Sequence, residues 1–430
     1  MASTYLHKNQ GSPTNAYKFT YSVWLKRSKI GVTQRFYQGY ESGNNRLYAM
    51  MTSNDTIFCY GVTGGNIQIN VETTRKYRDT NGWYNVVLKG DSTLNTATDR
   101  FQIWVNGVRE TSLTISSNIN QNTAFGNLVA QSNNTLTISG QESHNELWDG
   151  SMSHIHFTDG YAYDASAFGE TDATTGEWKI KTSPSVTYGN TGYFILKDGN
   201  SVTDQSGNSN NFTVGGGTLT KTEDNPSNVF ATLNPLDYES REVTLSNGNN
   251  TATFGGADDW SNHYGKSTLG MSSGKYYVEA KIGNVATNQL YPLAIVDIDR
   301  NITSSAGDNG IGAYSTGGIY SAGTQVQSGL GTWSNGDIAG AAFDATNGTL
   351  QFYRNGSTYG TQITGIDTSK TYSFCCNNYS GASVMYFNFG NGYFGTAAVS
   401  SAGTNASGNG IFEYDVPTGF TALSTKGLNL

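Results

Sequence analysis

Apolar and polar residues alternate in short runs along the first half of the chain, and Gly or Asn residues bound most of these runs. A period of two places successive side chains on opposite faces of a β-strand, so each run predicts one strand. Only residues 164–170 have the pattern of a helical turn. Short strands at this spacing are typical of a β-sandwich or β-barrel. The predicted strands cover residues 19–25, 46–51, 57–60, 66–71, 83–89, 101–105, 136–139, 151–158 and 193–197.

A second series of strands follows residues 222–237, where Pro226 and Pro235 stand among few apolar positions. Because strands are interrupted there, we expect a domain boundary in this segment. The predicted strands of the second series cover residues 242–245, 275–282, 294–297, 311–314, 338–343, 349–353, 372–376 and 385–389. The expected division is a first domain over 1–222, a linker over 223–240, a second domain over 241–396 and a C-terminal tail over 397–430.

The same turn signal closes one strand in each half. Residues 101–105 run into Asn106-Gly107, and residues 349–353 run into Asn355-Gly356. Asn-Gly accepts the positive φ angles of a two-residue turn and is the strongest short-range signal of a β-hairpin. The chain is therefore predicted to be all-β, with two tandem antiparallel β-sandwiches.

Composition and charge narrow the function classes. Only 13% of the 430 residues are charged, about half the usual share of roughly 25%, and Asn, Ser, Thr and Gly supply the polar surface. The formal net charge is −8 and no run of Lys or Arg occurs, which argues against nucleic-acid binding. No stretch approaches the roughly 18 apolar residues of a membrane span, so membrane insertion is not expected.

Residues 1–17 lack the apolar segment of a secretory signal peptide. The three cysteines, Cys59, Cys375 and Cys376, do not make a disulfide framework, and the last two are expected to be small buried hydrophobic residues. These features predict synthesis in a reducing cytoplasm, whereas the composition is typical of an extracellular adhesin. A protein assembled into a particle inside a cell and then released by lysis has both properties.

The second half, over about residues 240–396, resembles the SPRY (B30.2) domain. The segments that carry the resemblance are Gly-Lys-Tyr-Tyr-Val-Glu at 274–279, Gly-Asp-Ile-Ala-Gly at 336–340, Phe-Asp at 343–344, Asn-Gly-Thr-Leu-Gln-Phe-Tyr-Arg-Asn-Gly at 347–356 and Phe-Asn-Phe-Gly at 387–390. The resemblance implies a binding module without catalysis that recognises its ligand with loops at one edge of a sandwich.

The first half, over about residues 15–215, is similar to laminin-G/concanavalin A-like lectin domains. The segments that carry this similarity are 19–26, Trp-Tyr-Asn-Val-Val at 83–87, Phe-Gln-Ile-Trp-Val-Asn-Gly at 101–107 and Trp-Asp-Gly-Ser-Met at 148–152. Residues 204–208 resemble a segment often found at the start of such domains, so the strand order stays open. The two resemblances together imply that both sandwiches are concanavalin A-like jelly rolls.

Three further segments resemble structural proteins of tailed bacteriophages, especially marine ones. They are residues 204–212, residues 228–236 and the sequence Gly-Ile-Phe-Glu-Tyr-Asp-Val-Pro-Thr-Gly-Phe at 410–420. The resemblance implies a tail-fibre or capsid-decorating role at the virion surface, in a protein made in the host cytoplasm. It identifies no ligand.

The sequence offers no good catalytic constellation. Glycosidases on concanavalin A-like sandwiches carry carboxylates on alternate residues of one strand, and a retaining pair must lie roughly 5 Å apart. No E-x-D-x-E run exists, and Asp297 with Asp299 gives two carboxylates without a third. Only five histidines and no G-x-S-x-G elbow are present. We therefore expect a protein that is not an enzyme.

Two groups of residues have metal-ligand character. Glu142, Glu146 and Asp149 place oxygen donors in a polar turn that could hold Ca²⁺; an ordinary solvated hairpin explains the same residues. His154 and His156 share one face of a strand, as two zinc ligands would, but no third ligand is evident. The structural interpretation is therefore favoured for the histidines.

Aromatic residues in loops are the stronger candidates for ligand contact. Sugars present flat C–H faces that stack on Trp and Tyr, while neighbouring polar side chains bind the hydroxyls. With 12% aromatic residues many of these side chains will belong to the core instead. The candidates are Trp148 with Asp149 in the first domain, and Trp260, His263, Tyr264, Tyr314, Tyr320 and Trp333 in the second.

Two functional hypotheses remain open from the sequence. In the first, a virion attachment or decoration protein binds host-surface glycan, and oligomerisation, as a trimer in a fibre, multiplies weak single-site affinities. In the second, a purely architectural protein binds other virion proteins and no host ligand. A polysaccharide depolymerase would need a carboxylate cleft that the sequence does not offer. The apolar tail over 411–430 is expected to dock on a neighbouring protomer or domain, and its deletion to leave the sandwiches folded.

Overall fold

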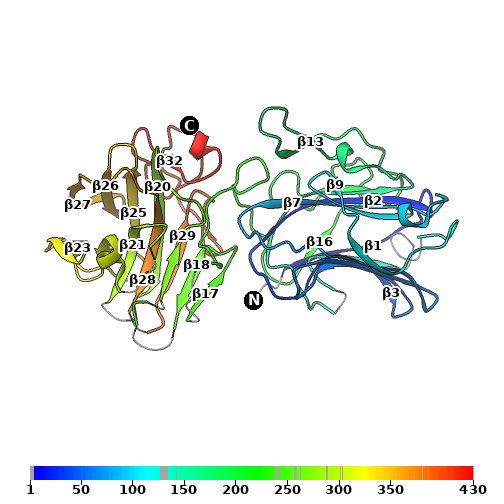
Figure 1. Cartoon of the computed structure of the whole chain (residues 1–430), viewed down its shortest axis with the longest axis horizontal. Coiled ribbons are helices and arrows are strands. Elements are labelled where there is room, and N and C mark those ends of the chain that lie inside the picture. The colour runs from blue at the N-terminus through cyan, green and yellow to red at the C-terminus, as the bar shows by residue number, and fades with distance from the viewer. Residues whose placement is uncertain are drawn as a thin grey trace. The chain divides into compact units, whose positions relative to one another are not determined.

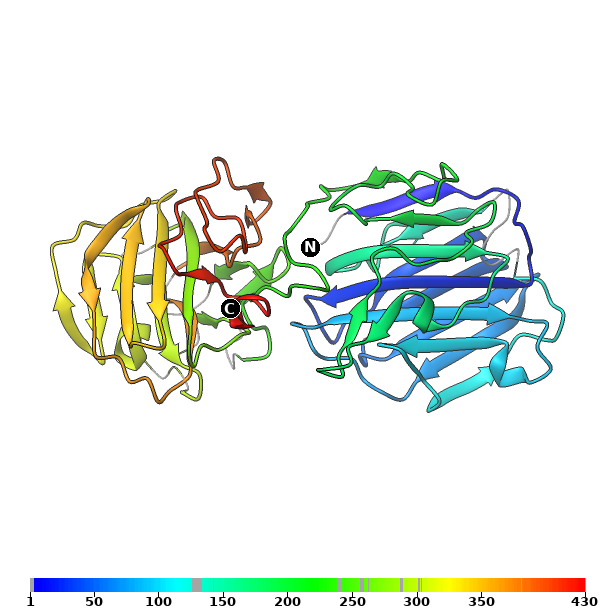
Figure 2. The same cartoon turned by 90° about the horizontal axis from the view of Figure 1, so that it is seen from above.

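The computed structural model describes residues 4–125, 134–141, 143–237, 242–255, 259–261, 263–286, 289–300, 302, 304–379 and 381–429. The chain divides into two compact units, unit 1 over Met1–Lys221 and unit 2 over Thr222–Leu430. Each unit contains two large β-sheets packed face to face (Figure 1, Figure 2), which confirms the predicted all-β fold class. None of the helices formed by the described residues is long and apolar enough to cross a lipid bilayer.

Unit 1 pairs an eight-stranded sheet with a six-stranded sheet, and all their strand pairs are antiparallel. The eight-stranded sheet has the order β10 (Leu113–Ser117), β6 (Asn66–Thr73), β5 (Ile57–Thr63), β4 (Asn45–Met51), β3 (Gln34–Ser42), β11 (Thr135–Ile138), β1 (Tyr5–Asn9) and β16 (Thr213–Gly215). The six-stranded sheet has the order β15 (Tyr193–Ile195), β12 (Gly150–Asp159), β2 (Lys18–Arg27), β7 (Trp83–Asp91), β8 (Phe101–Val105) and β9 (Val108–Arg109).

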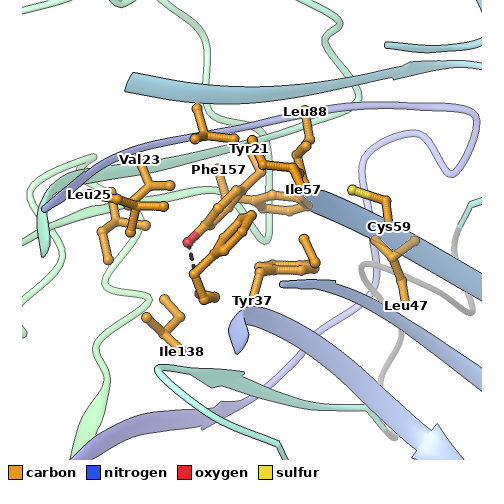
Figure 3. Packing of buried hydrophobic residues seen from close by; sticks show 14 of the residues in the cluster. Tyr21, Val23, Leu25, Tyr37, Leu47, Ile57, Cys59, Leu88, Ile138 and Phe157 are labelled. Carbon is orange, nitrogen blue, oxygen red and sulfur yellow. Dashed lines mark hydrogen bonds between the residues drawn. The ribbon is translucent and has the colours of Figure 1, made fainter. Parts of the chain in front are cut away.

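The core of unit 1 lies between these two sheets. Alternate residues of β2, including Tyr21, Val23 and Leu25, are fully buried and point toward the eight-stranded sheet (Figure 3). Side chains such as Tyr37 and Leu47 meet them from the other sheet. The hydroxyl of Tyr21 donates to the backbone oxygen of Phe36 at 3.2 Å, which satisfies a polar group that burial removes from water.

A further layer covers the outer face of the six-stranded sheet in unit 1. It is formed by residues 160–190, which contain β13 (Gly169–Thr171) and β14 (Trp178–Ile180), and Figure 1 shows β13 on the side of β2 and β7 that faces away from β3. Phe168 of this layer packs on Val87 of β7, and the backbone N–H of Tyr163 donates to the Thr20 hydroxyl at 2.7 Å. Both faces of β2 are therefore buried.

Unit 2 repeats the two-sheet arrangement. One sheet has the order β17 (Val243–Ser246), β18 (Thr251–Phe254), β29 (Val384–Asn388), β20 (Lys275–Asn284), β25 (Ile338–Asp344), β26 (Thr349–Arg354) and β27 (Ser357–Ile363), with β32 (Thr421–Ala422) parallel to β20. The other sheet has the order β19 (Tyr264–Lys266), β28 (Tyr372–Asn378), β21 (Leu290–Asp297), β22 (Gly310–Tyr314), β23 (Gly318–Ser321) and β24 (Thr324–Gln327). A two-stranded sheet of β30 (Tyr393–Phe394) and β31 (Ala397–Ala398) follows.

The segments expected to be a linker, 223–240, and a tail, 397–430, form part of unit 2 in the structure. Phe230 and Phe412 are buried in one cluster with Tyr277 of β20. The backbone N–H of Ala231 donates to the oxygen of Leu423 at 2.9 Å, so the two segments also pair with each other (Figure 2). Their apolar residues do not alternate regularly enough to predict strands, but they converge on one sheet face and form a layer over it.

Both predicted Asn-Gly turns are present and have the same geometry. The side-chain oxygen of Asn106 accepts the Asn85 N–H at 2.8 Å, and its own N–H donates to the Asn85 oxygen at 2.9 Å. Asn355 makes the same two bonds with Ile338, each at 2.8 Å. The φ angles of the two asparagines are 48° and 50°, in the left-handed region that Asn tolerates better than most residues. The β8–β9 and β26–β27 hairpins are therefore confirmed.

The glycine after each asparagine makes room for an aromatic ring from an outer layer. A Cβ on Gly107 would lie 2.4 Å from the ring of Trp178, and a Cβ on Gly356 would lie 2.5 Å from the ring of Tyr414. Trp178 belongs to the 160–190 layer of unit 1, and Tyr414 belongs to the C-terminal layer of unit 2. The two units therefore use the same contact to hold their outer layers.

Candidate functional site

The candidate site is an aromatic cluster in unit 2, defined as Trp260, Tyr291, Tyr314, Tyr320 and Tyr379. It lies on the face of the β19–β24 sheet that points away from the sandwich core. In β21, Leu293 and Ile295 pack into the core, whereas Ala294 and Val296 belong to the separate cluster that contains these aromatic residues. Tyr291 is buried at the centre of the aromatic cluster, and the other four side chains are half-buried.

The five rings contact one another in tilted and edge-to-face arrangements. The Trp260 ring centroid lies 5.5 Å from that of Tyr291, 6.4 Å from that of Tyr314 and 5.3 Å from that of Tyr379. Tyr314 lies 4.9 Å from Tyr291 and 5.4 Å from Tyr320. Aromatic pairs prefer such arrangements, which add about 0.5–1.5 kcal/mol per pair to the burial of their surface. The cluster is therefore held together by its own rings.

Two glycines allow the backbone to approach Tyr291 closely. A Cβ on Gly307 would lie 2.5 Å from the Tyr291 hydroxyl and 2.6 Å from Cβ of Tyr320. A Cβ on Gly312 of β22 would lie 2.6 Å from Cδ1 of Tyr291. Larger residues at either position would displace the rings, so these glycines determine how deeply Tyr291 sits beneath its neighbours.

Asn377 of β28 joins the two loops that border the aromatic cluster. Its side-chain nitrogen donates to the backbone oxygens of Trp260 and His263, both at 2.9 Å. Its side-chain oxygen accepts the N–H of Ala306 at 2.8 Å. Asn377 is fully buried, so loss of its amide would remove hydrogen bonds from the backbone groups of Trp260, His263 and Ala306 without water to replace them. Asn377 positions Trp260 from beneath.

His263 is the second residue that holds the 259–263 loop. His263 is fully buried. Its Nδ1 lies 2.7 Å from the backbone oxygen of Asp259. Its Nε2 lies 2.8 Å from the Glu242 carboxylate and also contacts the backbone oxygen of Gly255. Both ring nitrogens are thus engaged within the protein. His263 stabilises the loop that carries Trp260, and it is not positioned to contact a ligand.

A short helix, α2 (Ala306–Asn309), borders the other side of the cluster. Ser305 and Asp308 form a capping box: the Ser305 hydroxyl accepts the Asp308 N–H at 3.2 Å, and the Asp308 carboxylate accepts the Ser305 N–H at 3.1 Å. Burial raises the pKa of Tyr291, and the negative charge of Asp308 raises it further. Asp308 is exposed, so one carboxylate stands at the edge of the cluster.

Three of the residues singled out in the sequence, Trp260, Tyr314 and Tyr320, therefore meet in one cluster. Tyr264 is buried beneath them. Sequence reasoning missed Tyr291, which lies in an apolar run that reads as core. The signal that could have found it is Pro292, because proline within a strand marks a bulge, and the register of β21 shifts between Tyr291 and Ala294.

Trp148 and Trp333 were expected in exposed loops, but both lie in sandwich cores. Trp148 is 4% exposed and packs edge-to-face against Phe36 at 6.2 Å in unit 1. Trp333 is 2% exposed and packs against Tyr359 at 4.7 Å, with the Arg354 guanidinium over its ring. Neither indole is available for stacking on a sugar. Their neighbouring Gly and Asp residues imitate a loop signal in the sequence.

The predicted calcium ligands are Glu142, Glu146 and Asp149. Glu142 lies outside the described residues. The Glu146 carboxylate accepts from Nε of Arg35 at 2.5 Å, and burial raises the pKa of Asp149. No group of three His, Cys, Asp or Glu side chains that could hold a metal ion occurs in the part of the chain that the structure describes. Calcium binding stays a prediction.

The two strand histidines of unit 1 are packed beneath the outer layer. The His156 ring stacks on Phe194 at 3.9 Å, and its Nδ1 lies 2.9 Å from the Tyr188 hydroxyl. Burial lowers the pKa of His154 to about 4 and lowers that of His156 well below its usual range, and nearby Lys197 acts in the same direction. Both rings are neutral at pH 7, and the structural interpretation fits them.

The remaining acids and thiols have ordinary structural surroundings. Asp297 pairs with Lys370 at 3.3 Å and accepts the Asp299 N–H at 3.1 Å, so these two carboxylates form a solvated strand end. Cys375 and Cys376 are fully buried on opposite faces of β28, one in each hydrophobic cluster. They behave as small apolar side chains.

Comparison with known proteins agrees with a lectin-like fold in unit 1. Residues 2–162 match the family model of the concanavalin A-like lectin/glucanases superfamily. No curated protein matches the chain.

Similar solved structures include the SPRY domain of human HERC1, with 17% identity, coverage of 34% of this chain and 91% of that chain, and a TM-score of 0.28. The TRIM65 PSpry domain has 14% identity, 37% and 91% coverage and a TM-score of 0.30. The SAP-like pentraxin from Limulus polyphemus has 14% identity, 37% and 71% coverage and a TM-score of 0.28. Residues 2–162 are thus similar to concanavalin A-like lectin and glucanase domains, and the match ends within unit 1.

Proposed function

We propose that this chain is a bacteriophage virion surface protein, in a tail fibre or a capsid decoration, that binds a host-surface glycan without catalysis. The observation that supports it is the aromatic cluster of unit 2, where four half-buried rings lie outside the sandwich core. Rings held by their neighbours lose little side-chain entropy when they contact a sugar. The virion assignment is supported by the resemblance of residues 204–212, 228–236 and 410–420 to tailed-phage structural proteins.

The lectin-like match of unit 1 adds support for ligand binding. A chain with weak single sites gains avidity when several copies are joined, so we also propose a homo-oligomer, a trimer in the case of a fibre, with other virion proteins as partners. Light scattering of the purified chain tests this: a single-chain mass at micromolar concentration would contradict it.

The test is binding of the purified chain to a broad glycan array. We expect the wild type to bind, and Trp260→Ala and Tyr314→Ala to lose binding at least about tenfold, the cost of about 1.4 kcal/mol of lost contact. Tyr161→Ala is the control, because Tyr161 is an exposed tyrosine of unit 1. Equal binding by all four proteins would contradict the assignment of the site to the aromatic cluster.

The same array separates the competing roles. We expect binding to persist in a calcium chelator, because the Glu146 carboxylate is engaged by Arg35. A chelator-sensitive signal would redirect the search to Glu142, Glu146 and Asp149. A blank array with a folded, oligomeric protein would refute glycan binding and favour the purely architectural role in virion assembly.

A further inference from the structure

Several rings of this protein have a Lys or Arg over their faces, whereas the described residues place none over the aromatic cluster. Elsewhere Arg35 lies 4.1 Å from the Tyr48 ring centroid, and Lys266 lies 6.0 Å from that of Tyr264. Within the described ranges, no Lys or Arg lies over any of the five rings of the cluster. The faces of Trp and Tyr rings carry negative partial charge. Within the cluster the edges of neighbouring rings approach some of these faces, and no described cation does.

A carboxylate adds to the negative potential at the same place. Asp308 follows Gly307, whose backbone lies against both Tyr291 and Tyr320. The capping box holds the Asp308 carboxylate, and its charge acts on the Tyr291 hydroxyl. Among the described residues no Lys or Arg is within ion-pair distance of Asp308. The negative charge of Asp308 is therefore available to a ligand.

Two cations that the structure describes near this surface are engaged by other groups. The Lys266 ammonium lies 2.8 Å from the Asp237 carboxylate and contacts the backbone oxygens of Ile298 and Arg300. The guanidinium of Arg300 is 3.5 Å from the backbone oxygen of Asn309, at the end of α2. Ring faces and one exposed carboxylate on the same surface are complementary to a positive charge, because an ammonium group is attracted to both. A neutral or acidic sugar would use only the apolar part of this surface.

We propose that the aromatic cluster and Asp308 bind a protonated amino group, so that the glycan recognised by unit 2 carries an amino sugar with a free amine. This inference rests on the proposed glycan-binding function and narrows its ligand class. The ammonium lies against the half-buried rings, and Asp308 supplies the counter-charge. A cation over Trp or Tyr at a partly exposed site strengthens binding about fivefold.

The test uses the full chain and two probes that share one backbone and differ in whether their amines are free or acetylated. A chitosan hexamer carries free amines, and the chitin hexamer has the same backbone with every amine acetylated. At a pH where the amines are protonated, titration calorimetry is expected to give at least about fivefold tighter binding for chitosan. Choline should compete with chitosan, whereas its uncharged isostere 3,3-dimethylbutan-1-ol should not.

Two variants separate a local from a general charge effect. Asp308→Asn keeps an oxygen that can accept the Ser305 N–H, and it should lower chitosan affinity about fivefold while leaving chitin affinity unchanged. Asp367→Asn removes the same charge from an exposed acid of unit 2 outside the cluster, and it should change neither affinity. Equal losses in the two variants would overturn the inference, because they would show non-specific attraction.

The outcomes also separate this inference from the proposed function. If both hexamers bind equally and Trp260→Ala abolishes both, glycan binding stands and the amine preference is refuted. If chitosan and chitin fail to bind while the array identifies another glycan that depends on Trp260, the amine preference is refuted in the same way. If no glycan binds at all, both proposals fail.

Discussion

Phe412 is the residue at which docking of the C-terminal segment on unit 2 can be measured. Its side chain is 1% exposed and packs edge-to-face on Tyr277 of β20, with ring centroids 5.1 Å apart. The backbone around it is fixed as well: the N–H groups of Glu413 and Tyr414 donate to the buried Glu279 carboxylate at 2.8 Å and 2.9 Å. Phe412→Ala should therefore leave a cavity that this layer cannot close.

The expected loss of stability in Phe412→Ala follows from the burial of the Phe412 ring. Replacing a fully buried Phe by Ala costs about 3–5 kcal/mol. In a domain of about 200 residues each kcal/mol lowers Tm by about 2–4 °C, so even a loss of about 3 kcal/mol lowers the Tm of unit 2 by about 6–12 °C. Ile411→Ala is the matched control, because the neighbouring Ile411 side chain is 38% exposed and its truncation should cost well under about 1 kcal/mol.

The assay is thermal unfolding of the full chain combined with hydrogen exchange read by mass spectrometry. Peptides from β20 report on unit 2, and peptides from β2 report on unit 1, so the two units are scored separately. Phe412→Ala should lower protection of β20 and leave β2 unchanged. If Phe412→Ala and Ile411→Ala have the same Tm, burial of Phe412 does not stabilise unit 2, and the result agrees with the expectation that deleting the segment leaves the sandwiches folded.

Three further predictions concern pH and the support of the site. Unit 1 should lose stability as the pH falls below about 6.5, because the histidines of the unfolded chain then bind protons that buried His154 and His156 do not. Hydrogen exchange of β12 at pH 7 and pH 4.5 tests this, and His156→Phe should reduce the difference in protection between the two pH values. The stability of unit 2 should instead fall as the pH rises through 7. Burial raises the pKa of Glu279 to about 7, and the stability that protonated Glu279 contributes is lost when this group ionises. Constant β20 protection from pH 5 to pH 8.5 would contradict that. Asn377→Ala should cost unit 2 about 1–3 kcal/mol and weaken any Trp260-dependent glycan binding, and binding equal to wild type would show that Asn377 does not position Trp260.

Prediction of the candidate site from the sequence succeeded only in part, because residue type does not reveal exposure. Trp260 and Trp333 are both tryptophans near turn residues, yet one lies at the edge of the aromatic cluster and the other packs on Tyr359 in the core. Tyr291 was hidden in an apolar run, and Tyr379 lies between two polar residues. The pairing of β21 with β28 and β22 brings the rings of the cluster together. No local sequence pattern predicts this pairing.

The boundary of unit 2 was equally difficult to predict from the sequence. Residues 222–237 have few apolar positions, and the apolar residues of 397–430 show no regular alternation, so locally the two segments resemble a linker and a tail. Phe230 and Phe412 nevertheless share a buried cluster with Tyr277. The free energy that holds these two segments comes from burying Phe230 and Phe412 against a sheet formed by residues distant in the sequence.

The sequence by itself determined the features that depend on neighbouring residues. The period of two along Phe19 to Leu25 placed alternate side chains in the core, and Asn106-Gly107 and Asn355-Gly356 formed hairpins because their positive φ angles are local preferences. Only the tertiary structure decided which outward faces stay open and which are covered by a further layer. That choice depends on contacts between segments as far apart as Glu279 and Glu413, and such contacts leave no periodic signal in the chain.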